Sequence, residues 1–222
     1  MVTTYTTVSG FRCLSNTRHF NTRNEQPKIY VVCLSASQNN KAYGIWINAT
    51  QSVKEINQQI DYMLCHSPYP NPGATRSYAI RCYEGFYNLN FDLNARIEDI
   101  QTQAVFIAKH GELGAKLIDY YEGTLDAAEE LINEGYQGAY ESELEYATQL
   151  FNTLYLQGVP EHVRSYIDYE AVKTAIFWHY FFSIELDNKT HVFFEHLGDP
   201  EFKQCLEHFL RPYTWEQLTQ IA

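Results

Sequence analysis

The chain has 222 residues, of which 45% are hydrophobic and 15% aromatic, so it can form one large domain or two to three small ones with real cores. Its formal net charge is −11, which argues against direct binding of nucleic acid and favours basic partners. Its five cysteines form no CxxC pair, so reduced thiols in a cytoplasm are the simplest expectation. No apolar run approaches the roughly 18 residues of a membrane span.

Residues 1–27 are polar and net positive, and we interpret them as a loosely packed N-terminal extension with one short strand at residues 5–8. An arm that contacts nucleic acid is the alternative interpretation. The three arginines of the segment are few for that role.

The next segment, residues 28–90, predicts a small ββαβ domain. Residues 28–34 (KIYVVCL) are β-branched and apolar, residues 42–48 (AYGIWIN) form a second strand, and the polar run between them is expected to be a turn. Ser52 begins a capping box that opens a helix. Residues 77–83 (SYAIRCY) predict the third strand.

Residues 91–158 predict four short helices that form a compact bundle. Apolar residues recur at helical spacing on either side of Gly111, which interrupts the pattern. Thr124 can cap the third helix, and Gly135 is expected to end it as a C′ glycine. The run YQGAY is then expected to be a loop, and Ser142 opens a second capping box before the fourth helix.

Residues 159–197 predict a helix that is capped by Asp168, followed by an antiparallel hairpin at 180–186 and 190–195. Residues 198–222 are expected to add a C-terminal extension with two short helices, at about 201–209 and 214–221. The overall expectation is therefore an α+β fold of three small domains in a row between two extensions.

The charge is concentrated in the predicted bundle. Residues 91–158 hold 13 acids against three bases, a net charge of −10, and from Glu122 to Gly158 there is no Lys or Arg at all. Ordinary solvated helix faces mix charges of both signs, and a one-sign surface is destabilised by self-repulsion. We therefore predict a surface that imitates a row of DNA phosphates, with an uncommitted acidic domain as the alternative. The candidate acids in the helical blocks are Glu98, Asp99, Glu112, Asp119, Glu122, Asp126, Glu129, Glu130, Glu134, Glu141, Glu143 and Glu145.

No sequence pattern in the chain points to catalysis. A nucleophile elbow, phosphate loop, dinucleotide fingerprint and HExxH motif are all missing from the sequence. His191 and His196 would point to opposite faces of a strand, which makes them a poor pair of metal ligands. We expect no enzyme, cofactor or metal site.

Several separated blocks resemble, in order, the ArdA family of antirestriction proteins. They are IYVVCLSASQNNKAYGIWINA, YAIRCYEGF, HGELGAKLIDYYEG, YQGAYES followed by EYA, VPEHVRSYIDYEAVKTAI and HVFFEH, and they cover about residues 28–196. Members of that family are encoded on mobile elements and inhibit type I restriction–modification enzymes. They do so as elongated, dimeric DNA mimics that occupy the DNA-binding groove.

The resemblance implies a fold of three small domains in a row, and a homodimer that meets through the last domain. Tyr166, Ile167, Tyr169 and the strands within 180–195 are the interface candidates. The acidic composition and the lack of a long apolar run predict no direct binding of nucleic acid and no membrane association. The nearly neutral first domain departs from the family pattern, so the alternative is an acidic module for another basic DNA-binding protein, such as a repressor, a nucleoid protein or a nuclease effector.

Overall fold

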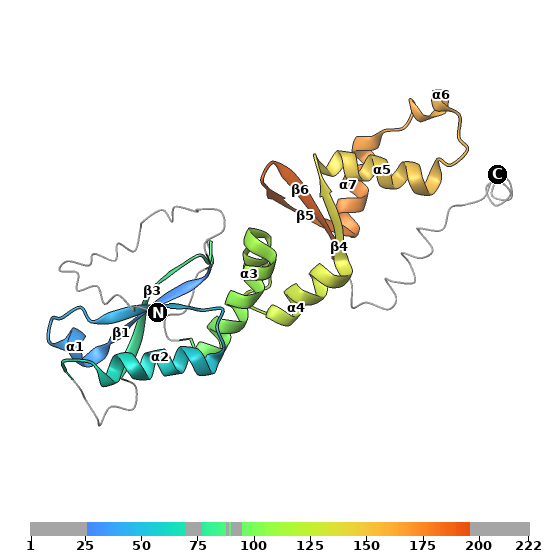
Figure 1. The fold of residues 1–222 in the computed structure, drawn as a ribbon. Helices are drawn as coiled ribbons and strands as arrows, with labels where there is room; N and C mark the ends of the chain where they lie inside the picture. Colours follow the sequence, from blue (N-terminus) through green and yellow to red (C-terminus); the bar gives the residue numbers. More distant parts are fainter. Residues whose placement is uncertain (1–25, 70–76, 88, 90–94, 196–222) are drawn as a thin grey trace. The chain divides into compact units, whose positions relative to one another are not determined.

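A computed structural model describes residues 26–69, 77–87, 89 and 95–195 and shows a mixed α+β protein (Figure 1). The chain separates into two compact units, Met1–Leu125 and Asp126–Ala222. Each unit contains one small antiparallel sheet of three strands, which we call sheet 1 and sheet 2. Among the described residues no helix is both long enough and apolar enough to cross a membrane.

Sheet 1 has the strand order β2-β1-β3, with β1 (Lys28–Cys33) in the centre. Its neighbours are β2 (Gly44–Asn48) and β3 (Tyr78–Glu84), and both pair antiparallel with β1. All three predicted strands are confirmed. The polar run after β1 is not the simple turn we expected, because it begins with the short helix α1 (Leu34–Gln38).

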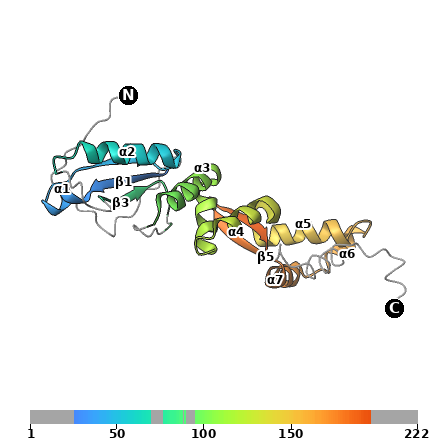
Figure 2. The same cartoon turned by 90° about the horizontal axis from the view of Figure 1, so that it is seen from below.

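Helix α2 (Val53–Cys65) lies along one face of sheet 1 (Figures 1 and 2). The predicted capping box is present, since the Ser52 hydroxyl accepts from the Glu55 backbone N–H and the Glu55 carboxylate accepts from the Ser52 N–H. The Ser52 hydroxyl also donates to the Glu55 carboxylate at 2.7 Å, and this bond, together with the one from the Ser52 N–H, lowers the pKa of Glu55. The apolar stripe of the helix, including Ile56, Ile60 and Met63, is buried.

Helix α3 (Ile97–Tyr120) completes the described part of the first unit and contacts α2. Its backbone is non-helical at Gly111, where φ is 65° and ψ is −146°. Side chains are disfavoured at such positive φ values, so glycine permits the kink. The interruption expected at this residue is therefore confirmed, and it divides α3 into two helical segments.

The second unit begins with a short helical run that leads directly into sheet 2. Helix α4 (Leu125–Glu130) continues into the π-helical turn η1 (Leu131–Gly135). Gly135 lies inside this turn and the chain then enters strand β4 (Tyr136–Tyr140). The predictions of a C′ glycine at 135 and of a loop at YQGAY are therefore wrong.

Sheet 2 has the order β4-β6-β5, so its central strand comes last in the chain. Strands β5 (Phe181–Leu186) and β6 (Lys189–Phe194) form the predicted hairpin. Asp187 and Asn188 adopt φ values of 54° and 61°, and two consecutive residues with positive φ are typical of a type I′ hairpin turn. β4 joins the other edge of β6 across more than 50 residues of chain.

Two helices pack together on sheet 2 and close the second core. They are α5 (Glu143–Tyr155) and α7 (Tyr169–His179), which are joined through the short α6 (Glu161–Arg164). Asp168 caps α7 as predicted, because its carboxylate accepts from the Ala171 N–H at 3.0 Å. The core holds Tyr146 and Ala147 of α5, Ile176 of α7, and Phe181, Val192 and Phe194 of the hairpin.

This packing differs from the predicted four-helix bundle at residues 91–158. Helix α3 belongs to the first unit, whereas α5 shares its core with α7 and the hairpin. The boundary between the units falls at Leu125/Asp126, inside the acidic stretch, so the expected arrangement of three domains is not confirmed. The predictions for the strand at 5–8 and the helices at about 201–209 and 214–221 lie outside the described residues.

The hydroxyl of Tyr146 is buried in the second core and has no hydrogen-bond partner among the described residues. Its ring makes edge contacts with Tyr140, Phe177 and Phe181. An unsatisfied buried polar group costs about 1–3 kcal/mol, so we expect Tyr146→Phe to raise the free energy of unfolding by about 1 kcal/mol. Urea denaturation near neutral pH measures this gain, and a loss of stability would contradict it.

The same substitution should also change the stability at alkaline pH. Burial of the Tyr146 hydroxyl is the main cause that raises its pKa well above the usual value. The nearby Tyr140 adds a smaller effect in the same direction. As the pH rises past that usual value, the unfolded chain releases the phenolic proton first, and the native state loses stability. The Phe variant lacks this proton, so we expect its stability to fall less steeply above about pH 10.

Candidate acidic binding surface

The acidic residues predicted as a surface are divided between the two units. Glu98, Asp99, Glu112 and Asp119 lie on α3, and Glu122 follows it. The remaining predicted acids begin with Asp126 on α4 and extend to the first turn of α5 in the second unit.

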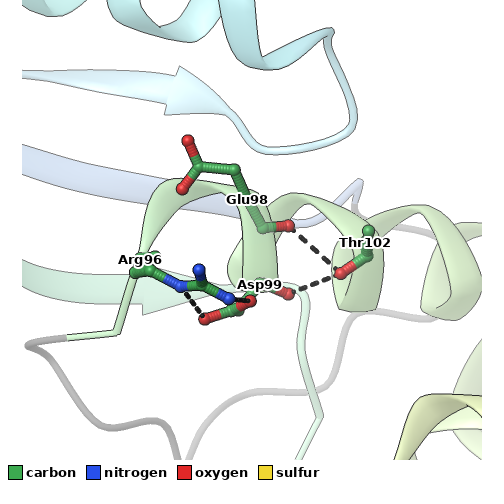
Figure 3. Close-up of polar contacts among 4 residues, drawn as sticks. All are labelled: Arg96, Glu98, Asp99 and Thr102. Carbon is green, nitrogen blue, oxygen red and sulfur yellow. Dashed lines mark hydrogen bonds and ion pairs between the residues drawn. The ribbon is translucent and has the colours of Figure 1, made fainter.

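The first turn of α3 carries one acid with an internal ion pair, Asp99, and one, Glu98, that makes no ion pair among the described residues (Figure 3). Asp99 accepts two hydrogen bonds from the Arg96 guanidinium, at 3.0 Å from Nε and 2.8 Å from Nη2. This pairing lowers the pKa of Asp99 and raises that of Arg96. The Glu98 carboxylate points away from this pair in Figure 3. Both acids lie where the helix dipole favours negative charge.

The C-terminal end of α3 carries acids, although the helix dipole disfavours negative charge there. Asp119 is exposed in the last turn, where the helix dipole is negative and the turn itself carries no basic residue. Glu122 follows with φ at 50°, a left-handed conformation that is uncommon for residues other than glycine. Local helix stability therefore does not explain the acids at this end.

The most uniform group of acids, which we call the α4 ridge, consists of Asp126, Glu129, Glu130 and Glu134. All four side chains are exposed, while Ala128 and Leu131 between them are buried. Spacings of three and four residues place helical side chains side by side, at about 5–6 Å. None of the four makes an ion pair with another described residue. The ridge is therefore a run of mutually repelling charges held by a buried apolar side.

The acids around the start of α5 are bound to the second unit itself. Lys189 of β6 pairs with Glu141, and Ser183 of β5 donates to Glu143 at 2.8 Å. Glu145 accepts from the Glu141 backbone N–H and from the Gln149 amide. The predicted capping box is half formed, because Ser142 accepts from the Glu145 N–H while the Glu145 carboxylate reaches Glu141 instead of Ser142. Glu141 and Glu143 thus connect the start of α5 to sheet 2, whereas Glu145 bonds only to nearby residues.

The predicted acids therefore differ in whether their carboxylates are available to bind a partner. Seven are exposed and make no ion pair within the described part of the chain, namely Glu98, Asp119, Glu122, Asp126, Glu129, Glu130 and Glu134. Asp99, Glu141, Glu143 and Glu145 have internal partners, and Glu112 is half-buried. The exposed group can accept hydrogen bonds and ion pairs from Lys and Arg without breaking any described contact.

Comparison with protein-family models gives a match over residues 29–185 to the antirestriction protein (ArdA) family. The chain belongs to the ArdA family. The matched region includes described parts of both units and all twelve predicted acids. No curated protein matches the chain. Family membership assigns an antirestriction function directed at restriction–modification enzymes, and ArdA proteins are inhibitors rather than enzymes.

The candidate interface residues of this ArdA chain are not equivalent. The ring of Tyr166, in the turn after α6, is 87% exposed. Ile167 is half-buried, and the half-buried Tyr169 donates its hydroxyl to Asn152 of α5 at 2.7 Å. Of the three predicted residues, Tyr166 is therefore the one that can give the largest area to a partner.

Sequence reasoning missed Trp178, which is 81% exposed in the last turn of α7. An exposed tryptophan is unusual because its large apolar ring is costly to leave in water. The position could have been found from the helix pattern, since Ile176 faces the core and a residue two places further along points away from it.

Proposed function

We propose that this ArdA-family protein inhibits a type I restriction–modification enzyme by occupying its DNA-binding groove as a mimic of double-stranded DNA. The α4 ridge is the observation that carries the proposal. Four exposed carboxylates with no described counter-charge are costly for the fold, and a basic groove would offset that cost.

The ridge has the chemistry that such a groove requires. On an α-helix, side chains three or four residues apart have their Cβ atoms about 5–6 Å from each other. Duplex DNA presents one phosphate charge per roughly 1.7 Å of axis when both strands are counted. The ridge, together with the exposed acids of α3, supplies carboxylates in place of phosphates. Lysine and arginine side chains that hold DNA can then donate to them, with release of screening ions.

The protein forms a homodimer in this proposal, through the second unit. Tyr166 and Trp178 support this part because both rings are largely exposed, and aromatic residues are enriched at protein interfaces. A dimer would present the α4 ridge twice and double the negative charge available to one enzyme. Asp99, Glu141, Glu143 and Glu145 would contribute to the field of the surface but chiefly position its helices.

The proposal predicts inhibition that depends strongly on salt. We expect the purified protein to displace double-stranded DNA from a type I enzyme at low salt, and excess DNA to reverse the inhibition. Between about 50 and 200 mM salt the inhibition constant should rise roughly tenfold or more, because the binding releases counterions. Fluorescence anisotropy of labelled DNA on the enzyme measures both effects.

Two results of that experiment would contradict the proposal. Inhibition that stays constant across the salt series would show that charge does not drive binding. Inhibition without displacement of DNA would place the contact outside the groove. If type I enzymes are not bound but another basic DNA-binding protein is, the acidic surface serves that partner instead.

A further inference from the structure

The connection between α5 and α7, which we call the α6 loop, consists of residues 156–168 and contains α6. It extends from the ends of the two helices away from sheet 2 (Figures 1 and 2). Of its residues only Leu156 is buried. Apolar burial therefore does little to order the loop, so hydrogen bonds have to fix its conformation.

Arg164, the last residue of α6, reaches back to the end of α5. Its Nη2 donates to the Leu156 carbonyl at 3.1 Å, and its Nε donates to the Val159 carbonyl at 3.4 Å. Leu156 is the C-cap of α5, where the helix dipole is negative and a cation is favoured. Because the guanidinium is a rigid fork of donors, one side chain joins both carbonyls to α6.

A further contact of Arg164 adds less. The Glu161 carboxylate lies 3.8 Å from the Arg164 Nε, and the Glu161 side chain is 91% exposed. An exposed ion pair of this length is worth little, because water screens it. The bonds to the carbonyls of Leu156 and Val159 are therefore the described contacts through which Arg164 orders the loop.

Tyr166 follows Arg164 in the turn that leads to α7. Its N–H donates to the Val163 carbonyl at 3.1 Å, and the Ile167 N–H donates to the Arg164 carbonyl at 3.2 Å. The Tyr166 side chain, by contrast, is largely exposed and makes no hydrogen bond or ring contact with another described residue. The loop thus presents an exposed aromatic ring on a backbone that is held on both sides.

An ordered backbone favours binding through such a ring. Association has to order the loops and side chains that meet, and a loop that is already ordered avoids part of that free-energy cost. The bonds of Arg164 join the segment before Tyr166 to the C-terminal end of α5. Without them, the loop would be held mainly at its two ends, and Tyr166 would sample more orientations.

We propose that Arg164 is a positioning residue of the homodimer. By bonding the end of α5 it holds the α6 loop so that Tyr166 meets a second copy of the chain in one fixed orientation. This role rests on the homodimer proposed above, in which Tyr166 is a contact residue. Arg164 acts through Tyr166, because its guanidinium is bonded to its own chain.

A double-mutant cycle of Arg164→Ala and Tyr166→Ser tests this role, with the dissociation constant of the full-chain homodimer, measured by sedimentation, as the readout. Each single variant should raise that constant, Arg164→Ala by roughly threefold to tenfold. In the Tyr166→Ser background, Arg164→Ala should have almost no further effect, because the ring through which it acts is gone. A general weakening of the second unit would instead give effects that add.

Arg96→Ala is the matched control. It removes the same charge and also an ion pair to an acid three residues further along, but in the first unit. It should leave the dissociation constant unchanged. Amide hydrogen exchange should become faster at residues 157–167 in the Arg164→Ala protein and stay unchanged in α5 and α7. If the exchange of these helices rises as well, Arg164→Lys replaces it, since lysine keeps the charge without the fork of donors.

Non-additive effects of the two substitutions on the dissociation constant support the positioning role. Additive effects overturn it, as do an unchanged constant in the Arg164 variants or an equal effect of Arg96→Ala. In those cases a weaker dimer in Tyr166→Ser alone would leave the homodimer contact in place. A native chain that is monomeric at all concentrations, or a dimer that withstands Tyr166→Ser, overturns the role of Arg164 together with the contact at Tyr166.

Discussion

Reversing two charges of the α4 ridge, Glu129→Lys with Glu130→Lys, should weaken inhibition of a type I enzyme by roughly 30-fold. Each exposed acid that faces a basic groove is worth about 1 kcal/mol, and the two together give about 2 kcal/mol. Adding Glu134→Lys should weaken inhibition further. The measurement is the inhibition constant in a DNA-cleavage assay at low salt.

The fold should tolerate this change, which separates a binding defect from a structural one. Neither acid has an ion-pair partner among the described residues. A lysine at 130 would lie four residues from both Asp126 and Glu134, so the free energy of unfolding should stay constant or rise by about 0.5 kcal/mol. Reduced inhibition with this unchanged stability identifies the ridge as a contact surface.

A matched control separates the position of the charges from their number. Asp61→Lys with Asn57→Lys and Gln58→Lys makes the same change in net charge at exposed sites of α2, outside the acidic stretch. We expect the control to lose much less inhibition than the ridge variant. Equal losses would mean that total charge alone governs binding, and an unaffected ridge variant would remove the ridge from the interface.

The second large effect is expected at the dimer contact. We expect Trp178→Ser to raise the dissociation constant of the homodimer by roughly 30-fold or more, because truncating a buried interface tryptophan costs about 2–4 kcal/mol. Sedimentation or light scattering over a concentration series measures the shift toward monomer. Trp178 is largely exposed in the single chain, so its removal should leave the fold intact.

Tyr62→Ser is the matched control for this substitution. Tyr62 is also an exposed aromatic residue near the end of a helix, α2, but it lies in the first unit. It should leave the dimer unchanged. A native protein that is monomeric at all concentrations would contradict the homodimer itself. A dimer that withstands Trp178→Ser would instead place the contact on another surface.

The elements that the sequence predicted correctly depend on signals between neighbouring residues. The capping box at Ser52 and the cap at Asp168 were both identified from residues within one helical turn. The kink at Gly111 follows from the conformational freedom of glycine. Sheet 1 was also predictable, because β1 is an apolar, β-branched run and the aliphatic and aromatic residues of β2 and β3 suit strands that pair with it.

The prediction failed where distant parts of the chain decide the structure. YQGAY has a central glycine and no β-branched residue, so the local pattern favoured a loop. It becomes β4 because β6, more than 50 residues later, presents a partner edge. Likewise α5 has an ordinary amphipathic pattern, and only the tertiary structure shows that its apolar side packs on α7 and sheet 2.

The sequence by itself determined the charge of the acidic stretch and the family to which the chain belongs, because both are properties of residue order. The tertiary structure decided which acids remain available. Glu141 and Glu143 look equivalent to Glu129 and Glu130 in the sequence, yet Lys189 and Ser183 approach them from a distant hairpin. Whether a carboxylate is internally paired depends on what folds beside it, and that information is not local to the helix that carries it.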